Sequence, residues 1–590
     1  MTIRNHDVVI LGGGLAGLSL ARHLLLETDR TVLLLERREQ LPPKRQKVGE
    51  STVQLAGYYF SKVLDLEEYL WHGQLMKYNL RFYWKSPGHD GSSFEHYSHG
   101  FIRPFSNIAS YQLDRNTFEA ELLRRNLESP RFTFVAGVTD LEVDLSDDGP
   151  HQVAFHSLHG DTSLQADWVV DTTGRGRYLA RRLGLRQENN IDHGAFFWWV
   201  DGLVNIDKLT DGSATDIRLK KEHSSLGHLP TWLATNHFCA EGLWFWVIPL
   251  RHKTSLGLVF DRRVLDPGDV FSVEKATAWV CERFPLFARD LPHREVLDFG
   301  GFRSFSYDCA QTIDPSRWAM AGEAGRFTDP LYSPGSDLIS IYNTLIVDAI
   351  ETPADELEAK CALYEQLMRS VYEAYVPSYA TSYDVLGDPE IFALKYTWEL
   401  TVYFGGYVFP FINDLFTERR FIVPFLRLFF RLGPLNRKVQ SFLSDYFQWK
   451  KEHGVLPSEP IFFDFMSIHP LARAEKTFYR VGVSVEEARE VLEEQVQNLD
   501  ELARFLVAHV ASAVVGDRRV LTNKPFVEAI DPLQMQFDAE AIRARWAACA
   551  DSSETYGWTF DPHVCDDFRS PASPEAEEVD EEETRKELAG

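Results

Sequence analysis

The chain carries a glycine-rich segment with the spacing needed to bind the pyrophosphate of a dinucleotide. Residues 12–17 read GGGLAG and follow the apolar run Asp7–Leu11, which is suited to a buried strand. In this GxGxxG pattern Gly12 permits a tight turn, Gly14 lets the backbone approach the pyrophosphate, and Gly17 allows a helix to pack closely on the strand. The helix predicted after the glycines offers free N–H groups and a positive dipole end to the phosphates.

An acidic residue lies where the ribose of such a ligand would be. The second predicted strand, Thr31–Leu35, ends at Glu36. A carboxylate roughly 20 residues beyond the glycines can accept ribose hydroxyl protons. The elements that must position these groups are a strand, a helix and a second parallel strand, so the sequence predicts a doubly wound α/β nucleotide-binding domain. The glycines alone do not distinguish FAD from NAD.

Composition narrows the function classes. The chain has 590 residues and a formal net charge of −26, which disfavours nucleic acid as a partner. Its 6 cysteines include no CxxC pair, so we expect neither a disulfide framework nor a metal site. No apolar run reaches the ~18–20 residues of a transmembrane helix, and no signal-peptide core is present. We therefore expect a cytoplasmic protein without a membrane partner.

Three later segments favour FAD. Arg115 opens a predicted helix, Gly174 ends a strand-to-turn segment, and Glu323 lies in a second strand-to-helix turn. This order resembles the FAD-binding domain of flavin monooxygenases, and the resemblance implies that all three residues contact the cofactor. The usual residue at the last position is Asp, so Glu323 is one methylene longer. Because no second nucleotide-binding glycine motif is present, we expect a separate flavin reductase to supply reduced FAD.

Four further segments resemble the flavin-dependent halogenases. Residues 243–249, LWFWVIP, match their WxWxIP signature, and residues 327–335, FTDPLYSPG, match Fx₂Px₂SxG. Residues 76–84 are similar to the segment that carries their catalytic lysine, and Glu50 lies in a GES turn like the one near their flavin. The resemblance covers roughly the first 350 residues, in the order of the family. It points to the types with a long C-terminal region that act on phenol, pyrrole or tethered substrates.

The resemblance also implies a mechanism and a catalytic lysine. In the family, reduced FAD and dioxygen form a hydroperoxide, chloride or bromide becomes hypohalous acid, and a lysine beside the substrate delivers it. Here that lysine is Lys77, and the local alternation predicts a strand with Lys77, Asn79 and Arg81 on one face. The same alternation also fits a solvent-exposed strand lysine. Lys47 is the competing lysine and is interpreted as a flavin contact.

The expected halide site departs from the family pattern. Halide would lie against the Ser333 hydroxyl and the Gly335 N–H, with Ser333 also in a catalytic role. Pro334, between them, has no N–H to donate. One missing donor to a charged group costs about 1.5–3 kcal/mol, which leaves open an enzyme that has abandoned halide. Tyr332 replaces the glutamate of the free-tryptophan halogenases and lines the expected substrate site, which favours an already activated ring.

Several tryptophans are candidates for the boundary between flavin and substrate. Trp244 and Trp246 lie two apart on a predicted strand and share one face. They would separate the two sites so that only a small oxidant passes, or pack under the flavin. Trp198 belongs to the aromatic run Phe196–Trp199 and is expected to line the substrate pocket.

The C-terminal third should be a separate helical domain. We predict an FAD domain with an interleaved β-rich substrate region over residues 1–350, a helical domain that caps the substrate site over 351–569, and a disordered acidic tail over 570–590. The basic, aromatic segment Arg419–Leu432 fits an acidic carrier protein or a membrane surface. A core helix with charged ends that Pro424 breaks early explains the same residues and is preferred.

The sequence leaves three hypotheses in order of preference. The first is an FADH₂- and O₂-dependent halogenase of an electron-rich aromatic intermediate in secondary metabolism, free or carrier-bound. The second is a flavin monooxygenase on the same scaffold, motivated by Pro334. The third is a non-catalytic flavin-binding or carrier-docking protein.

Overall fold

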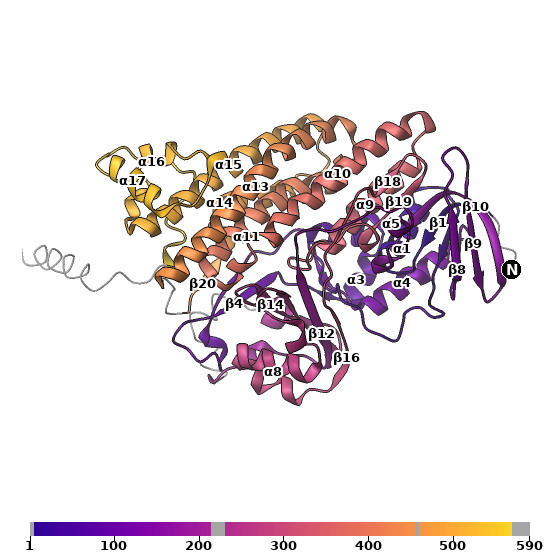
Figure 1. Cartoon of the computed structure of the whole chain (residues 1–590), viewed down its shortest axis with the longest axis horizontal. Helices are drawn as coiled ribbons and strands as arrows, with labels where there is room; N and C mark the ends of the chain where they lie inside the picture. The colour runs from indigo at the N-terminus through magenta and orange to yellow at the C-terminus, as the bar shows by residue number, and fades with distance from the viewer. Residues whose placement is uncertain (1–4, 214–229, 455–459, 569–590) are drawn as a thin grey trace, which may run out of the picture.

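The computed structural model of the chain describes residues 5–213, 230–454 and 460–568. It has a nucleotide-binding part around β1 and β10, a second sheet around β4, β14 and β16, and a layer of long helices that runs along both (Figure 1). The acidic tail predicted over residues 570–590 lies outside the described residues.

The first sheet is the predicted doubly wound α/β sheet. Its strand order is β18-β19-β10-β1-β2-β7, and β9 and β8 extend it beside β10. Strands β1, β2, β7, β10 and β19 are parallel, and their apolar residues are buried, as expected for a sheet covered on both faces. The strands are β1 His6–Leu11, β2 Val32–Leu35, β7 Phe132–Val135, β8 Thr139–Asp144, β9 His151–Ser157, β10 Gly160–Asp171, β18 Ile313–Asp314 and β19 Trp318–Met320.

The second sheet has eight strands in the order β16-β12-β15-β14-β13-β4-β5-β20. One face packs on helix α8 (Val273–Arg283), and the other face joins the apolar core that it shares with the nucleotide-binding part and the long helices. The strands are β4 Leu80–Lys85, β5 Tyr97–Phe101, β12 His193–Asp201, β13 Thr235–Ala240, β14 Leu243–Pro249, β15 Lys253–Asp261, β16 Val296–Phe302 and β20 Phe462–Asp464.

Smaller elements connect the two sheets. Two short strand pairs join β3 (Leu75–Met76) to β6 (Tyr111–Gln112) and β11 (Arg186–Gln187) to β17 (Asp308–Cys309). Besides α8, the α-helices described in the first 350 residues are α1 Leu15–Glu27, α2 Gln54–Tyr58, α3 Glu67–Gly73, α4 Arg115–Leu127, α5 Tyr178–Arg182 and α9 Pro334–Ile350. Helix α1 packs against α4 and α9.

The C-terminal region is helical, as predicted. Its helices are α10 Ala354–Ala380, α11 Pro389–Tyr403, α12 Phe409–Ile412, α13 Arg419–His453, α14 His469–Thr477, α15 Val485–Val515, α16 Lys524–Glu528 and α17 Ala539–Cys549. Helices α10, α11, α13 and α15 pack in one layer over both sheets (Figure 1). Strand β20 leaves this region and pairs with β5, so the helical region also adds a strand to the second sheet.

Helix α13 corrects the prediction that Pro424 breaks the basic segment early. The helix continues through Pro424 and Pro434 for 35 residues. Its apolar residues, including Phe421 and Phe425, are buried, while Arg427 and its neighbouring arginines are exposed. Packing on α10 and α15 holds the helix together where each proline removes a hydrogen bond. The segment is therefore a core helix, as preferred from the sequence, but Pro424 does not break it. None of the described helices is long and apolar enough to cross a membrane.

Candidate active site

The glycine turn after β1 has the geometry that close approach to a ligand requires. Gly12 has φ +110°, and a Cβ there would lie 2.6 Å from the carbonyl oxygen of Thr172. A Cβ on Gly17 would overlap the carbonyl oxygen of Gly12, so only glycine lets α1 start this close to the sheet. A Cβ on Gly14 would meet nothing within 4 Å, so the backbone before α1 is open on that side.

Glu36 fixes the same turn. It follows β2, is buried, and its carboxylate accepts hydrogen bonds from the N–H of Gly13 at 2.7 Å and of Arg38 at 2.8 Å. The carboxylate oxygens keep lone pairs for ribose hydroxyls, as its predicted role requires.

The other predicted cofactor residues gather on the same side of the first sheet. Arg115, at the start of α4, donates to the carbonyl oxygen of Val48 at 2.8 Å, and its buried Nε has no partner among the described residues. Desolvation raises the pKa of the half-buried Glu323, while the charges of Arg175 and Arg115 lower it. Gly174 has φ +58°, and a Cβ there would meet no atom within 4 Å. An open glycine backbone, an orphaned arginine donor and a nearby carboxylate fit the phosphates and hydroxyls of FAD.

The GES turn joins the cofactor residues to the second sheet. Glu50 is buried, and burial raises its carboxyl pKa to about 7, while hydrogen bonds from Trp199 and Ser255 lower it. The indole Nε1 of Trp199 donates to Oε1 of Glu50 at 2.8 Å. Ser51, the next residue, accepts a hydrogen bond from Nζ of Lys77 at 3.1 Å. The turn therefore connects the predicted flavin site to the predicted catalytic lysine.

Lys77 is buried, with 5% of its surface exposed, which contradicts the alternative of a solvent-exposed lysine. The predicted continuous strand is wrong, because residues 77–79 separate β3 from β4 and Asn79 has φ +61°. The backbone N–H of Lys77 donates to Ser110 at 2.8 Å instead. Desolvation lowers the pKa of Lys77 to about 7, and the negative charge of Asp337 opposes that shift.

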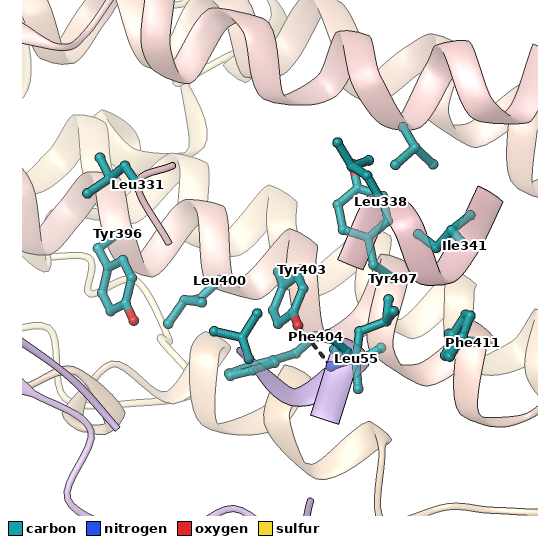
Figure 2. Packing of buried hydrophobic residues seen from close by; sticks show 14 of the residues in the cluster. Leu55, Leu331, Leu338, Ile341, Tyr396, Leu400, Tyr403, Phe404, Tyr407 and Phe411 are labelled. Atoms are coloured by element: carbon teal, nitrogen blue, oxygen red, sulfur yellow. Dashed lines mark hydrogen bonds between the residues drawn. The ribbon is translucent and has the colours of Figure 1, made fainter. Parts of the chain in front are cut away.

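Lys77 lies on the wall of a cavity of about 580 Å³, which is lined by residues of the segments 76–80 and 102–110, by the start of α9 and by the C-terminal helices α10, α11 and α13. Aromatic side chains supply much of the wall, and a few polar groups face it. The lining residues include Lys77, Tyr332, Pro334, Asp337, Tyr379, Tyr396, Glu399, Tyr403 and Tyr407. Tyr396, Leu400 and Tyr403 point to the same side of α11, as Figure 2 shows. The cavity suits a flat aromatic ligand.

Asp337 is the charged partner of Lys77 across the cavity. Its Oδ1 accepts the N–H of Ala56 at 2.9 Å, while the Tyr403 hydroxyl accepts the N–H of Leu55 at 3.1 Å (Figure 2). These two contacts cap the start of α2. Burial raises the pKa of Asp337 to about 7, against the lowering effects of Tyr403, Ala56 and Lys77. Its Oδ2 is buried and has no hydrogen-bond partner among the described residues.

The SxG turn starts α9 beside this cavity. Tyr332 and Ser333 both have positive φ, +68° and +62°, so the chain enters the helix through two left-handed residues. Pro334 is the first helical residue, and the N–H groups of Gly335 and the next residue are in the first turn, where no intrahelical acceptor exists. Tyr332 and Pro334 line the cavity, whereas Ser333 and Gly335 are not among its lining residues. Halide binding by Ser333 and Gly335 stays a prediction.

The tryptophans lie on opposite faces of the second sheet. Trp244 and Trp246 share one face, with ring centroids 5.6 Å apart, but neither lines the cavity. Their position between flavin and substrate stays a prediction. The prediction for Trp198 is wrong: its ring stacks on Phe245 on the α8 side of the sheet. Side chains alternate along β12, so Trp199 occupies the flavin side instead.

A buried hydrogen-bond network braces the SxG turn against the second sheet. Asp329 accepts a hydrogen bond from the N–H of Leu331 at 2.9 Å and lies 2.7 Å from Nδ1 of His193. The Tyr383 hydroxyl contacts the same carboxylate and accepts from the indole of Trp244 at 2.6 Å. One tryptophan of the WxWxIP motif thus helps to position the start of α9.

Lys47 and two acidic residues of the cavity have environments that the sequence did not predict. Lys47 forms an ion pair with the buried Glu119, which also binds Arg115, so the competing lysine supports a cofactor residue from behind. Asp337 and Glu399 were not singled out from the sequence. An acid four residues after Ser333 was an available signal for Asp337, but nothing local marks Glu399, which is brought to the cavity by α11.

Comparisons with known proteins identify relatives of this chain. No family model matches the chain. The flavin-dependent halogenase chlA of Dictyostelium discoideum is 25% identical over 438 residues, which cover 68% of this chain and 70% of that protein. The tetracycline 7-halogenase of Kitasatospora aureofaciens is 26% identical over 372 residues, 58% of this chain and 63% of the relative. This chain therefore resembles flavin-dependent halogenases over 68% of its length.

Solved structures show the same fold. This chain superposes on the crystal structure of halogenase PltM with a TM-score of 0.58 at 17% identity, over 84% of this chain and 96% of that one. The flavin-dependent halogenase CmlS gives a TM-score of 0.50 at 22% identity, over 67% and 65% of the two chains. The fold and the relatives named above together indicate an FAD-dependent oxidoreductase. When bound, the flavin supplies the oxidising power, and the residues described above would hold it.

Proposed function

We propose that Lys77 holds hypohalous acid and delivers it to an electron-rich aromatic ring in the adjoining cavity. The observation that carries this proposal is a buried amino group on the wall of an aromatic cavity, hydrogen-bonded to Ser51 of the GES turn. Burial lowers the pKa of Lys77 to about 7, so the ammonium and the amine both exist near neutral pH. A lysine of this kind donates a hydrogen bond to the oxidant and transfers a proton easily.

The substrate class follows from the cavity and is supported by relatives. A ring that already carries a hydroxyl or a pyrrole nitrogen needs little help to react with an electrophilic halogen. One relative, from Pseudomonas fluorescens, is a 1H-pyrrole-2-carbonyl peptidyl-carrier protein chlorinase, 26% identical over 57% of this chain. A solved structure with the same fold holds phloroglucinol and FAD. A free phenol or pyrrole is the proposed substrate, and a carrier-bound one is kept as a second form of it.

The remaining site assignments are part of the same proposal. Halide would bind at Ser333 and the N–H of Gly335, in the first turn of α9, where N–H groups and the helix dipole attract an anion. Trp244 and Trp246 would separate the flavin from the cavity. A separate reductase would supply the reduced flavin, and the boundary between the FAD and helical domains would lie between α9 and α10.

The proposal is tested by replacing Lys77. The protein is supplied with FAD, a flavin reductase, NADH and bromide, and brominated products of a panel of phenols and pyrroles are followed by mass spectrometry. Lys77→Ala should abolish product while reduced flavin is still oxidised by dioxygen. Lys62→Ala, at a lysine with 52% of its side chain exposed, is the matched control and should retain product. If Lys77→Ala instead loses FAD binding, Lys77 has a structural role and the proposal is wrong.

A further inference from the structure

A second charged group faces the cavity from the C-terminal helices. Glu399 lies on α11, and its Oε1 is 2.5 Å from Nζ of Lys395 and accepts Nε2 of Gln440 at 3.0 Å. Lys395 is completely buried and also donates to the carbonyl oxygen of Ser378 at 2.9 Å. Hydrogen bonds therefore fix one oxygen of the Glu399 carboxylate from behind.

The other carboxylate oxygen lacks a partner besides the nearby Tyr332 in the described part of the chain. Oε2 of Glu399 and the hydroxyl of Tyr332 are both buried, and apart from their interaction with one another neither has a hydrogen-bond partner among the described residues. The pKa of Tyr332 is raised chiefly by burial and then by the charge of Glu399, so the two groups lie near one another on the cavity wall. An unpaired carboxylate oxygen in an aromatic cavity is unfavourable unless a ligand brings a donor to it.

We propose that Glu399 accepts the hydroxyl of a hydroxylated aromatic substrate and makes the enzyme selective for rings with a free O–H. The Glu399 carboxylate supplies the negative charge that neutral Tyr332 cannot. This inference rests on the proposed function, since it names the substrate class and a substrate contact for the same cavity. The tyrosines that surround the carboxylate, Tyr379 and Tyr396, provide flat walls for the ring.

The two charged groups divide the proton transfers of ring halogenation. The ring carbon attacks the halogen of hypohalous acid, a carbon–halogen bond forms, and the oxygen–halogen bond breaks. The Lys77 ammonium gives its proton to the departing hydroxide, which leaves as water. The substrate hydroxyl gives its proton to Glu399, so the ring intermediate is a neutral dienone and not a cation. The ring proton then passes to the Lys77 amine, and Glu399 returns its proton to the oxygen.

Binding of hydroxylated rings and their methyl ethers tests this assignment. Phloroglucinol, resorcinol and naphthol, each with its methyl ether, are titrated against the FAD-loaded full chain by calorimetry. At least one phenol of the panel should bind, and its ether at least about 10-fold more weakly, because the ether has no hydrogen to donate to the carboxylate. Glu399→Gln should weaken phenol binding by about 10- to 100-fold and remove most of the preference over the ether.

Matched variants separate this role from a general effect on the cavity. Glu494→Gln changes the same side chain outside the cavity, where 62% of it is exposed, and it should bind phenols as the wild type does. If Glu399→Gln does not fold, Glu399→Asp keeps the charge but withdraws it by one methylene and should lose the same preference.

Several outcomes overturn the assignment. They are no binding of any phenol to the wild type, ethers that bind as tightly as phenols, or an unchanged preference in the Glu399 variants. Failure of the proposed function is recognised separately, because wild-type protein would then form no trapped hypohalous acid from bromide, whatever it binds.

Discussion

Removing the positive charge of Lys77 should make the protein more stable while destroying its activity. Lys77 is buried, and its pKa falls from an ordinary 10.5 to about 7. The folded state therefore binds fewer protons than the unfolded state between pH 7 and pH 10.5, and the stability of the wild type rises with pH through that window. The methionine in Lys77→Met is of similar length and carries no charge. The stability of this variant therefore lacks the pH dependence that Lys77 causes.

The size of the effect follows from the same pKa. At 1.36 kcal/mol for each tenfold change in proton affinity, burying Lys77 costs about 4 kcal/mol at pH 7 and about 1 kcal/mol at pH 10. The attraction between Lys77 and Asp337 is already contained in this pKa, so the expected gain at neutral pH is about 4 kcal/mol. Lys77→Met should therefore unfold at a higher urea concentration than the wild type, and the difference should shrink as the pH rises.

The assay is urea unfolding followed by far-UV circular dichroism at pH 7 and pH 10, at equal FAD concentrations. Lys47→Met is the matched control. Lys47 is paired with Glu119, whose side chain is only 2% exposed, so its removal should destabilise the protein by about 1–3 kcal/mol. A Lys77→Met variant that is no more stable than the wild type, or whose advantage does not depend on pH, would refute the reasoning.

Three further predictions concern other parts of the fold. Pro334→Thr restores an N–H at the start of α9 and should lower the halide concentration needed for half-maximal product by about 10-fold, measured with bromide in a steady-state assay; an unchanged requirement would remove Pro334 from the halide site. Lys450→Met leaves the buried carboxylates of Asp388 and Glu390, each 2.7 Å from its ammonium, without their cation, and should lower stability by about 3–5 kcal/mol in urea unfolding; a smaller loss than 1 kcal/mol would show that water or protonation compensates. Gly17→Ala places a methyl group on the carbonyl oxygen of the glycine turn and should abolish FAD binding, measured by flavin fluorescence; FAD binding within about 3-fold of the wild type would contradict the close packing of α1.

The glycine turn was predictable because its requirements are local. The strand, the three glycines and the acid that follows lie within a short stretch. Glycine is required there by the conformation of the backbone or by a close contact with it. Gly12 needs positive φ, and Gly17 needs room for the start of α1. The fold class therefore followed from the sequence, while the cofactor contacts of these residues stay predictions.

The environment of Lys77 was only partly predictable. Its identity as the candidate lysine came from the resemblance to the halogenases, but the alternation that predicted a continuous strand fails at Asn79, where φ is positive. The lysine instead depends on Ser51 and Ser110, which approach it from other segments. Alternation on β12 likewise places Trp198 and Trp199 on opposite faces of the sheet, and no local feature distinguishes the face that carries Trp199 from the one that carries Trp198.

The second half of the site could not be predicted from local sequence. Glu399 lies 322 residues after Lys77 and reaches the cavity only because α11 packs over the second sheet. The length of helix α13 was underestimated for the same reason. Its contacts with distant helices stabilise it, so it continues past Pro424 and Pro434. Positions of this kind are decided by contacts between distant elements.

The most direct test of the central claim needs no aromatic substrate. The protein is loaded anaerobically with reduced FAD and mixed with oxygenated buffer that contains a hypohalous-acid trap, with and without chloride or bromide. The account predicts that trapped oxidant forms only when halide is present. Flavin oxidation that is indifferent to halide, with no trapped oxidant, would contradict the account and assign the cavity to direct oxygenation.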